Sequence, residues 1–160
     1  MYSFRHAFFW TDERRYKFLC VVGDQSETTS CDSKKHKNNS TVVAIESTGV
    51  LPTLSTGKKS WGELSILSEM DGKFEQDLKR KGYTQSVCHL LRMLRNIQSH
   101  YKKLPEPVKN ILGNTRYPYA YFNAELPDLF PEMYFIIRST AGTGDDWVQR
   151  NGTEEVLLKK

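Results

Sequence analysis

The clearest pattern of apolar and polar positions lies in residues 87–100, VCHLLRMLRNIQSH. At about 100° per residue, the apolar side chains of this stretch fall in one arc of roughly 160°. That arc holds Val87, Leu90, Leu91, Met93, Leu94 and Ile97. The opposite arc holds Cys88, His89, Arg92, Arg95, Asn96, Ser99 and His100, and only Gln98 is misplaced. The pattern predicts an amphipathic helix from Val87 to about Tyr101, with the apolar arc in the core.

Helix-start and helix-stop signals predict further helices on both sides of this stretch. Thr11 is a typical N-cap for a helix that ends at Gly23. Residues 61–82 read as one helix, or as two helices interrupted near Gly72. Pro105 and Pro107 open a short helix, which Gly113 would end. Residues 117–138 read as two more short helices, with Pro127 near the second start and Pro131 in its first turn or at a new start. The predicted fold class is therefore all-α.

The rest of the chain is polar and predicts segments outside this helical core. Residues 25–60 are rich in Ser, Thr, Asn and Lys, which is typical of a flexible insertion or long loop. Residues 139–160 read as a flexible tail, so the predicted domain covers residues 1–138. Aromatic residues make up 12% of the chain, too many for a wholly disordered protein.

Composition also limits the function classes. The net charge of +4 favours polyanionic partners weakly. Three widely spaced cysteines without a CxxC pair argue against a zinc site or a disulfide framework. We expect no metal, no cofactor and a cytoplasmic location. No apolar run reaches membrane-spanning length, and the first residues lack the apolar run of a signal peptide.

The polar arc of residues 87–100 has the side chains that RNA cleavage needs when no metal takes part. Such cleavage uses the 2′-hydroxyl of the substrate as nucleophile. Histidine suits proton transfer, arginine binds phosphate by paired hydrogen bonds, and asparagine is a neutral donor. A solvated basic face, or a His100 that interacts only with the end of its own helix, would give the same pattern. Residue chemistry alone therefore indicates a candidate phosphate-binding face.

Three ordered blocks resemble the KEN ribonuclease domain family of ribonuclease L and the inositol-requiring kinase/endoribonuclease of the unfolded-protein response. The blocks are HAFFWTDERRYKFLCVVGD, SVCHLLRMLRNIQSHYKKLP and YAYFNAELPDLFPEMYF. The first and third look closer to ribonuclease L. The resemblance implies an all-helical endoribonuclease that acts as a homodimer on single-stranded RNA. It implies products with 2′,3′-cyclic phosphate and 5′-hydroxyl ends, formed without metal.

The resemblance also implies roles for individual residues. His100 matches the family's catalytic histidine and would be the general acid, while Arg95 and Asn96 would hold the phosphate. Tyr121 matches a site tyrosine, although core packing would explain it equally well. Trp61 sits near the spacing of a functional tryptophan, although it could equally anchor a helix.

The remaining candidates lie around these residues, and two positions depart from the family pattern. Arg92, His89 and Ser99 on the polar arc are expected to bind substrate. Gly82 stands where the stress-response enzymes have a tyrosine proposed as general base, and Tyr83 follows it as our candidate base. His89 stands where the family has an acid. Both departures support the alternative function, a catalytically inactive module of the same fold that binds RNA or dimerises.

A third interpretation concerns the start of the chain. Phe8, Phe9 and Trp10 precede the first helix, and ordinary core packing would explain them. If exposed, they would form an apolar patch. We expect a second copy, or a kinase or pseudokinase domain, to dock there. This interpretation fits both a fragment of a longer kinase–nuclease and a stand-alone domain.

Overall fold

The computed structural model describes residues 9–23, 64–70 and 87–140. Its helices are, in order, α1 (Asp12–Gly23), α4 (Ser65–Glu69), α6 (Val87–Ser99), the 3₁₀ turn η5 (Tyr101–Lys103), α7 (Glu106–Ile111), α8 (Tyr119–Glu125) and α9 (Leu129–Thr140). These three stretches contain no strand, so the predicted all-α class is confirmed. The predicted insertion at residues 25–60, the break near Gly72 and most of the predicted tail lie outside the described residues.

The first helix begins and ends where its sequence signals place it. The Thr11 hydroxyl oxygen accepts a hydrogen bond from the Arg14 backbone N–H at 3.3 Å, which satisfies one open donor of the first turn. Asp12 and Glu13 occupy that turn, where the helix dipole favours acids. The helix ends at Gly23, as predicted.

The short helix after α6 also begins and ends at the residues that the sequence predicts. Helix α6 ends at Ser99, two residues before the predicted end, and continues into η5. Pro105 caps α7, and Pro107 lies in its first turn, where a missing N–H does no harm. Gly113 has a φ of +75°, so it ends α7 in the left-handed conformation that its lack of a Cβ permits.

The two predicted C-terminal helices are α8 and α9. Pro127 lies two residues before α9, and Pro131 lies within the first turn of that helix rather than at a new start. A proline in the first turn removes no intrahelical hydrogen bond. The expectation of a start near Pro127 is confirmed.

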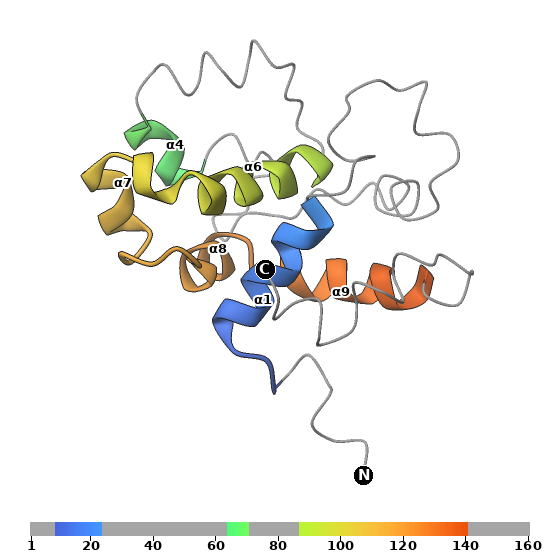
Figure 1. The fold of residues 1–160 in the computed structure, drawn as a ribbon. Coiled ribbons are helices and arrows are strands. Elements are labelled where there is room, and N and C mark those ends of the chain that lie inside the picture. The colour runs from blue at the N-terminus through green and yellow to red at the C-terminus, as the bar shows by residue number, and fades with distance from the viewer. Residues whose placement is uncertain (1–8, 24–63, 71–86, 141–160) are drawn as a thin grey trace, which may run out of the picture.

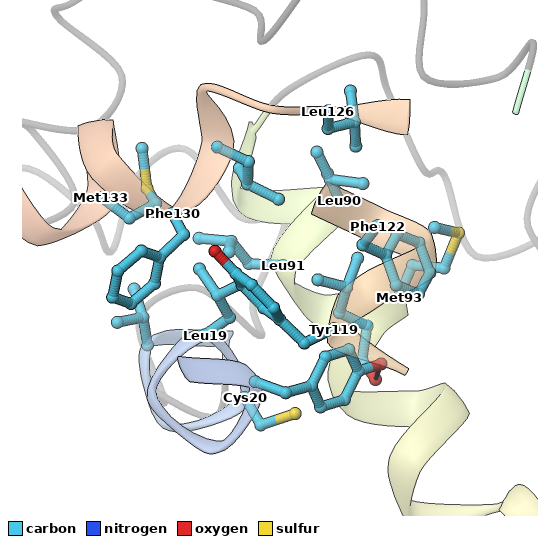
Figure 2. Packing of buried hydrophobic residues seen from close by; sticks show 14 of the residues in the cluster. Leu19, Cys20, Leu90, Leu91, Met93, Tyr119, Phe122, Leu126, Phe130 and Met133 are labelled. Carbon is cyan, nitrogen blue, oxygen red and sulfur yellow. Dashed lines mark hydrogen bonds between the residues drawn. The ribbon is translucent and has the colours of Figure 1, made fainter. Parts of the chain in front are cut away.

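The core forms where α1 packs against α6, and α8 and α9 also contact α1 (Figure 1). Figure 2 shows Leu19 of α1, Leu91 of α6, Phe122 of α8 and Met133 of α9 meeting in one buried cluster. The buried Tyr16 hydroxyl also donates a hydrogen bond to the Leu94 carbonyl at 2.9 Å. Such a bond contributes about 1 kcal/mol and fixes how far α1 slides along α6.

Trp10 is a core residue, and this corrects the predicted docking patch. Its side chain is 7% exposed, and its ring lies 5.7 Å from Phe18, 6.0 Å from Phe130 and 5.7 Å from Tyr134. Aromatic pairs at these distances each add about 0.5–1.5 kcal/mol beyond burial. Trp10 therefore fastens the entry of α1 to α9. Of the predicted patch, Phe9 is exposed and Phe8 lies outside the described residues.

Candidate functional site on the second half of helix α6

Helix α6 brings the predicted polar residues together on three successive turns. Arg92 comes first, Arg95 and Asn96 lie one turn on, and Ser99 and His100 lie one turn further. The arginines and Asn96 are half-buried, whereas Ser99 and His100 are exposed. The His100 N–H donates to the Asn96 carbonyl at 2.9 Å, so the helical path continues through His100. Exposure on this face therefore increases along the helix, from the half-buried arginines to the exposed His100 imidazole.

The apolar arc is confirmed, but two members of the polar arc are not on an open face. His89 is 7% exposed and Cys88 is 5% exposed, although the helical wheel placed both with the polar residues. A helical wheel gives only the angle of each side chain around the helix axis. It does not show which other parts of the fold pack against that side chain. The first five residues of α6 are buried on every side, whereas the polar face opens only from Arg92 onward. A side chain as buried as His89 offers almost no surface to a substrate, so its predicted substrate-binding role lacks an accessible surface.

His100 lies where the helix changes into a tighter turn. It caps η5, and its carbonyl accepts from the Lys103 N–H at 2.8 Å. Lys102 and Lys103 follow directly, and both are exposed. Along the sequence, His100 is therefore preceded by half-buried arginines and followed by two exposed lysines. Helix α6 contributes no carboxylate to this surface.

A further cation at this end of α6 was missed by the sequence reasoning. The Arg116 Nε–H donates to the Gln98 carbonyl at 3.4 Å, two residues before His100, and the Arg116 side chain is exposed. The two residues are 18 positions apart, so no helical periodicity connects them. The only signal in the sequence was an arginine in a short loop rich in turn-forming residues.

Tyr121 has a structural contact of its own. Its hydroxyl accepts a hydrogen bond from the Ile66 N–H at 3.0 Å and lies 2.9 Å from the Ser65 hydroxyl oxygen. Burial raises the pKa of the Tyr121 hydroxyl, so this group stays protonated at neutral pH. These contacts hold the first turn of α4 against α8. Its site role stays a prediction, as do those of Trp61 and Tyr83, which lie outside the described residues.

The described ranges contain neither a metal-binding cluster nor a membrane-spanning helix. In residues 9–23, 64–70 and 87–140, no three His, Cys, Asp or Glu side chains are grouped so that they could hold a metal ion. Cys20 and Cys88 are both buried. None of the helices described has both the length and the apolar character needed to cross a bilayer.

Comparison with known proteins places this chain in a family. The model of the family "Ribonuclease 2-5A" matches residues 15–150, which include all of α6 and the loop that carries Arg116. The chain belongs to the Ribonuclease 2-5A family. The predicted KEN-type resemblance is thereby confirmed.

The chain is similar both to 2-5A-dependent ribonucleases and to kinase/endoribonucleases. The 2-5A-dependent ribonuclease of Mus musculus is 31% identical over 84% of this chain. The serine/threonine-protein kinase/endoribonuclease ire-1 of Caenorhabditis elegans is 32% identical over 81% of this chain. The IRE1 protein of Oryza sativa subsp. japonica, with the same descriptive name, is 28% identical over 86%. The matches cover 18%, 12% and 14% of these relatives, so the chain spans less than one fifth of their length.

The residues predicted to be catalytic can now be placed on the structure of a family member. The relatives are named ribonucleases, and this puts the chain in a family of RNA-cleaving enzymes. Arg95, Asn96 and His100, the three positions that carried the resemblance to a catalytic motif, lie together on the accessible half of α6. His89, where we expected the chain to depart from the family pattern, lies on the buried half.

Proposed function

We propose that this chain is a metal-independent endoribonuclease that cleaves single-stranded RNA. One observation carries the proposal: an exposed His100 follows half-buried Arg95 and Asn96 on the same face, in a chain of a ribonuclease family. Exposure lets the imidazole reach an RNA strand. Partial burial of Arg95 limits the freedom of its side chain and strengthens its hydrogen bonds to an anion.

The proposed reaction is an internal transfer of the phosphoryl group. The 2′-hydroxyl oxygen attacks the adjacent phosphorus, the bond from phosphorus to the 5′-oxygen breaks, and a 2′,3′-cyclic phosphate forms. His100 donates a proton to the departing 5′-oxygen, which leaves as a 5′-hydroxyl. Arg95 and Asn96 donate hydrogen bonds to the non-bridging oxygens, where negative charge grows in the transition state. Tyr83 is our candidate for accepting the 2′-hydroxyl proton.

Arg92 and Ser99 complete the proposed site from the turns on either side. Arg92 lies one turn before Arg95 and adds a second cation along the same face. Ser99 is exposed beside His100, and its hydroxyl reaches only the Gln98 side chain, at 3.5 Å, among the described residues. Both side chains suit contacts with the sugar–phosphate backbone that orient the strand without reading its bases.

We further propose that the active form is a homodimer. The names of the kinase/endoribonuclease relatives suggest a second partner, a kinase domain. The exposed Phe9 is the described residue through which we propose that such a domain docks. The dimer makes a prediction of its own: the cleavage rate should rise faster than linearly with protein concentration.

The test is incubation of the purified chain with end-labelled single-stranded RNA in excess chelator. We expect cleavage products with cyclic phosphate and 5′-hydroxyl ends. The matched substrate has a single 2′-deoxynucleotide at the main cleavage position, which removes the nucleophile and should abolish cleavage there. Cleavage at the 2′-deoxy position would contradict the mechanism. Strands that stay intact at all protein concentrations, yet bind the protein, would favour the inactive RNA-binding module.

A further inference from the structure

Arg116 is held at the end of α6 by its own loop. The Gly113 N–H donates to the Asn110 carbonyl at 3.0 Å, and the Asn114 N–H donates to the Lys109 carbonyl at 2.8 Å. This pair of bonds is a Schellman motif, which ends a helix and fixes the direction of the chain that leaves it. The loop therefore departs from α7 on a defined path.

A second turn follows immediately and fixes the backbone on the other side of Arg116. The Thr115 hydroxyl oxygen accepts from the Tyr117 N–H at 3.1 Å, and the Tyr119 N–H donates to the Tyr117 carbonyl at 2.7 Å. Both contacts span Arg116 or follow it directly. Pro118 then leads into α8 with its fixed φ. An exposed arginine on so constrained a loop pays less entropy to bind a ligand than one on a free chain.

The guanidinium of Arg116 keeps most of its donors after its contact with α6. Arginine has five N–H donors, and the hydrogen bond to Gln98 uses one, at Nε. The Arg116 Cζ also lies 6.0 Å from the centre of the Tyr117 ring. Within the part of the chain that the structure describes, no carboxylate forms an ion pair with Arg116. The nearby Lys109 differs, because its Nζ lies 2.7 Å from a Glu106 carboxylate oxygen.

The contact with Gln98 alone would make Arg116 a helix cap, since cations favour the carbonyl end of a helix. Three facts go beyond capping: the side chain is exposed, its loop is fixed, and its anchor lies two residues before His100. Lys102 and Lys103 add exposed positive charge just after His100. An RNA strand that places one phosphate at His100 carries further phosphates on either side of it.

We propose that Arg116 binds a phosphate that flanks the scissile one, and so positions the RNA strand across His100. This inference rests on the proposed function, since it assumes that RNA occupies the accessible half of α6. Arginine suits the task because its planar fork makes paired hydrogen bonds to phosphate oxygens. Such a contact positions the strand and is independent of base sequence.

The test measures binding of an uncleavable, 2′-deoxy-substituted RNA by fluorescence anisotropy over a range of salt concentrations. Arg116→Gln keeps an N–H donor for the Gln98 carbonyl and removes the charge. We expect about three- to tenfold weaker binding at low salt and a salt slope smaller by about one. Arg116→Lys should recover part of the affinity, since it restores charge without the fork. Lys109→Gln is the matched control, because it removes one positive charge from a side chain that already forms an ion pair with Glu106.

The outcomes separate this inference from the proposed function. Unchanged binding by Arg116→Gln would overturn the inference, as would an equal loss in Lys109→Gln. A dinucleotide carries only the scissile phosphate, so its ability to compete should not change in Arg116→Gln. If that competition falls as much as binding of the long RNA, Arg116 acts through the fold of α6 and the inference is wrong. Failure to cleave RNA would contradict the proposed function and leave the binding result standing.

Discussion

The two halves of α6 differ in burial although they share one amphipathic pattern. Residues 87–91 are buried on all sides, including the polar His89. Residues 92–100 bury only one face and present arginines, an amide, a hydroxyl and an imidazole on the other. The first half is held inside the fold, and the second half extends its polar face toward solvent. A residue's place along a helix therefore decides as much about its function as its angle around the helix.

Gly23 marks the boundary between these halves. A Cβ at this position would collide with the Leu91 carbonyl oxygen and lie 2.7 Å from the Leu91 carbonyl carbon and 3.2 Å from the Arg92 nitrogen. Backbone atoms cannot swing aside as a flexible side chain can. The end of α1 can thus approach α6 this closely only with glycine at position 23. This approach helps to enclose the first half of the helix.

The largest structural effect should follow from Gly23→Ala. We expect a loss of about 2–4 kcal/mol in the free energy of unfolding, because the added methyl group forces the backbones of α1 and α6 apart. Chemical denaturation measures this loss. Gly113→Ala is the control, since its Cβ would meet nothing within 4 Å and only its φ of +75° opposes alanine. That control should lose about 1 kcal/mol, and equal losses in the two variants would contradict the close approach.

An added negative charge should destabilise the fold more in the first half of α6 than in the second. We expect His89→Asp to lower the free energy of unfolding by about 1–3 kcal/mol, because it replaces a buried imidazole with a carboxylate, whose charge is costly to bury. Ser99→Asp, on the exposed last turn, should stay within about 0.5 kcal/mol of the parent apart from a small helix-dipole penalty. Denaturation of both variants in the same buffer provides the comparison. Equal tolerance at both positions would show that position 89 is open.

The smallest effect concerns Tyr121. We expect Tyr121→Phe to lose about 1 kcal/mol, because the Ile66 N–H loses its acceptor. Since burial raises the folded-state pKa of Tyr121, its stabilising contribution is complete below the unfolded value near pH 10. That contribution is lost as the pH rises through the folded value. Denaturation at pH 7 and pH 11 measures it, and a loss of cleavage far beyond the loss of stability would assign Tyr121 to the site.

Much of the fold was predictable because its signals are local. Thr11, Gly113 and Pro131 act through their own turns, and the apolar arc of α6 follows from period alone. The choice between core packing and a docking patch for Trp10 stayed open, because its partners, Phe130 and Tyr134, lie about 120 residues away along the chain. No local pattern reports such a contact.

The candidate site was predictable to the same extent. Arg95 and Asn96 lie on α6 and His100 directly follows its last residue, so their spacing placed them on one face. His89 has the right angle but lies inside the fold, which only tertiary packing reveals. Arg116 reaches α6 through two successive turns, and residue types alone do not show where such a loop ends. Local chemistry therefore predicted the centre of the proposed site, whereas the burial of His89 and the position of Arg116 required the structure.

The central claim is that the accessible half of α6 carries the chemistry, and His100→Ala tests it most directly. We would measure the single-turnover rate of RNA cleavage in excess chelator and the free energy of unfolding on the same preparation. Asn110→Ala, an exposed amide on α7, is the matched control. The account predicts a rate lower by about 10²–10⁴-fold, with stability unchanged within about 0.5 kcal/mol. A His100→Ala protein that cleaves RNA at the parent rate would contradict it.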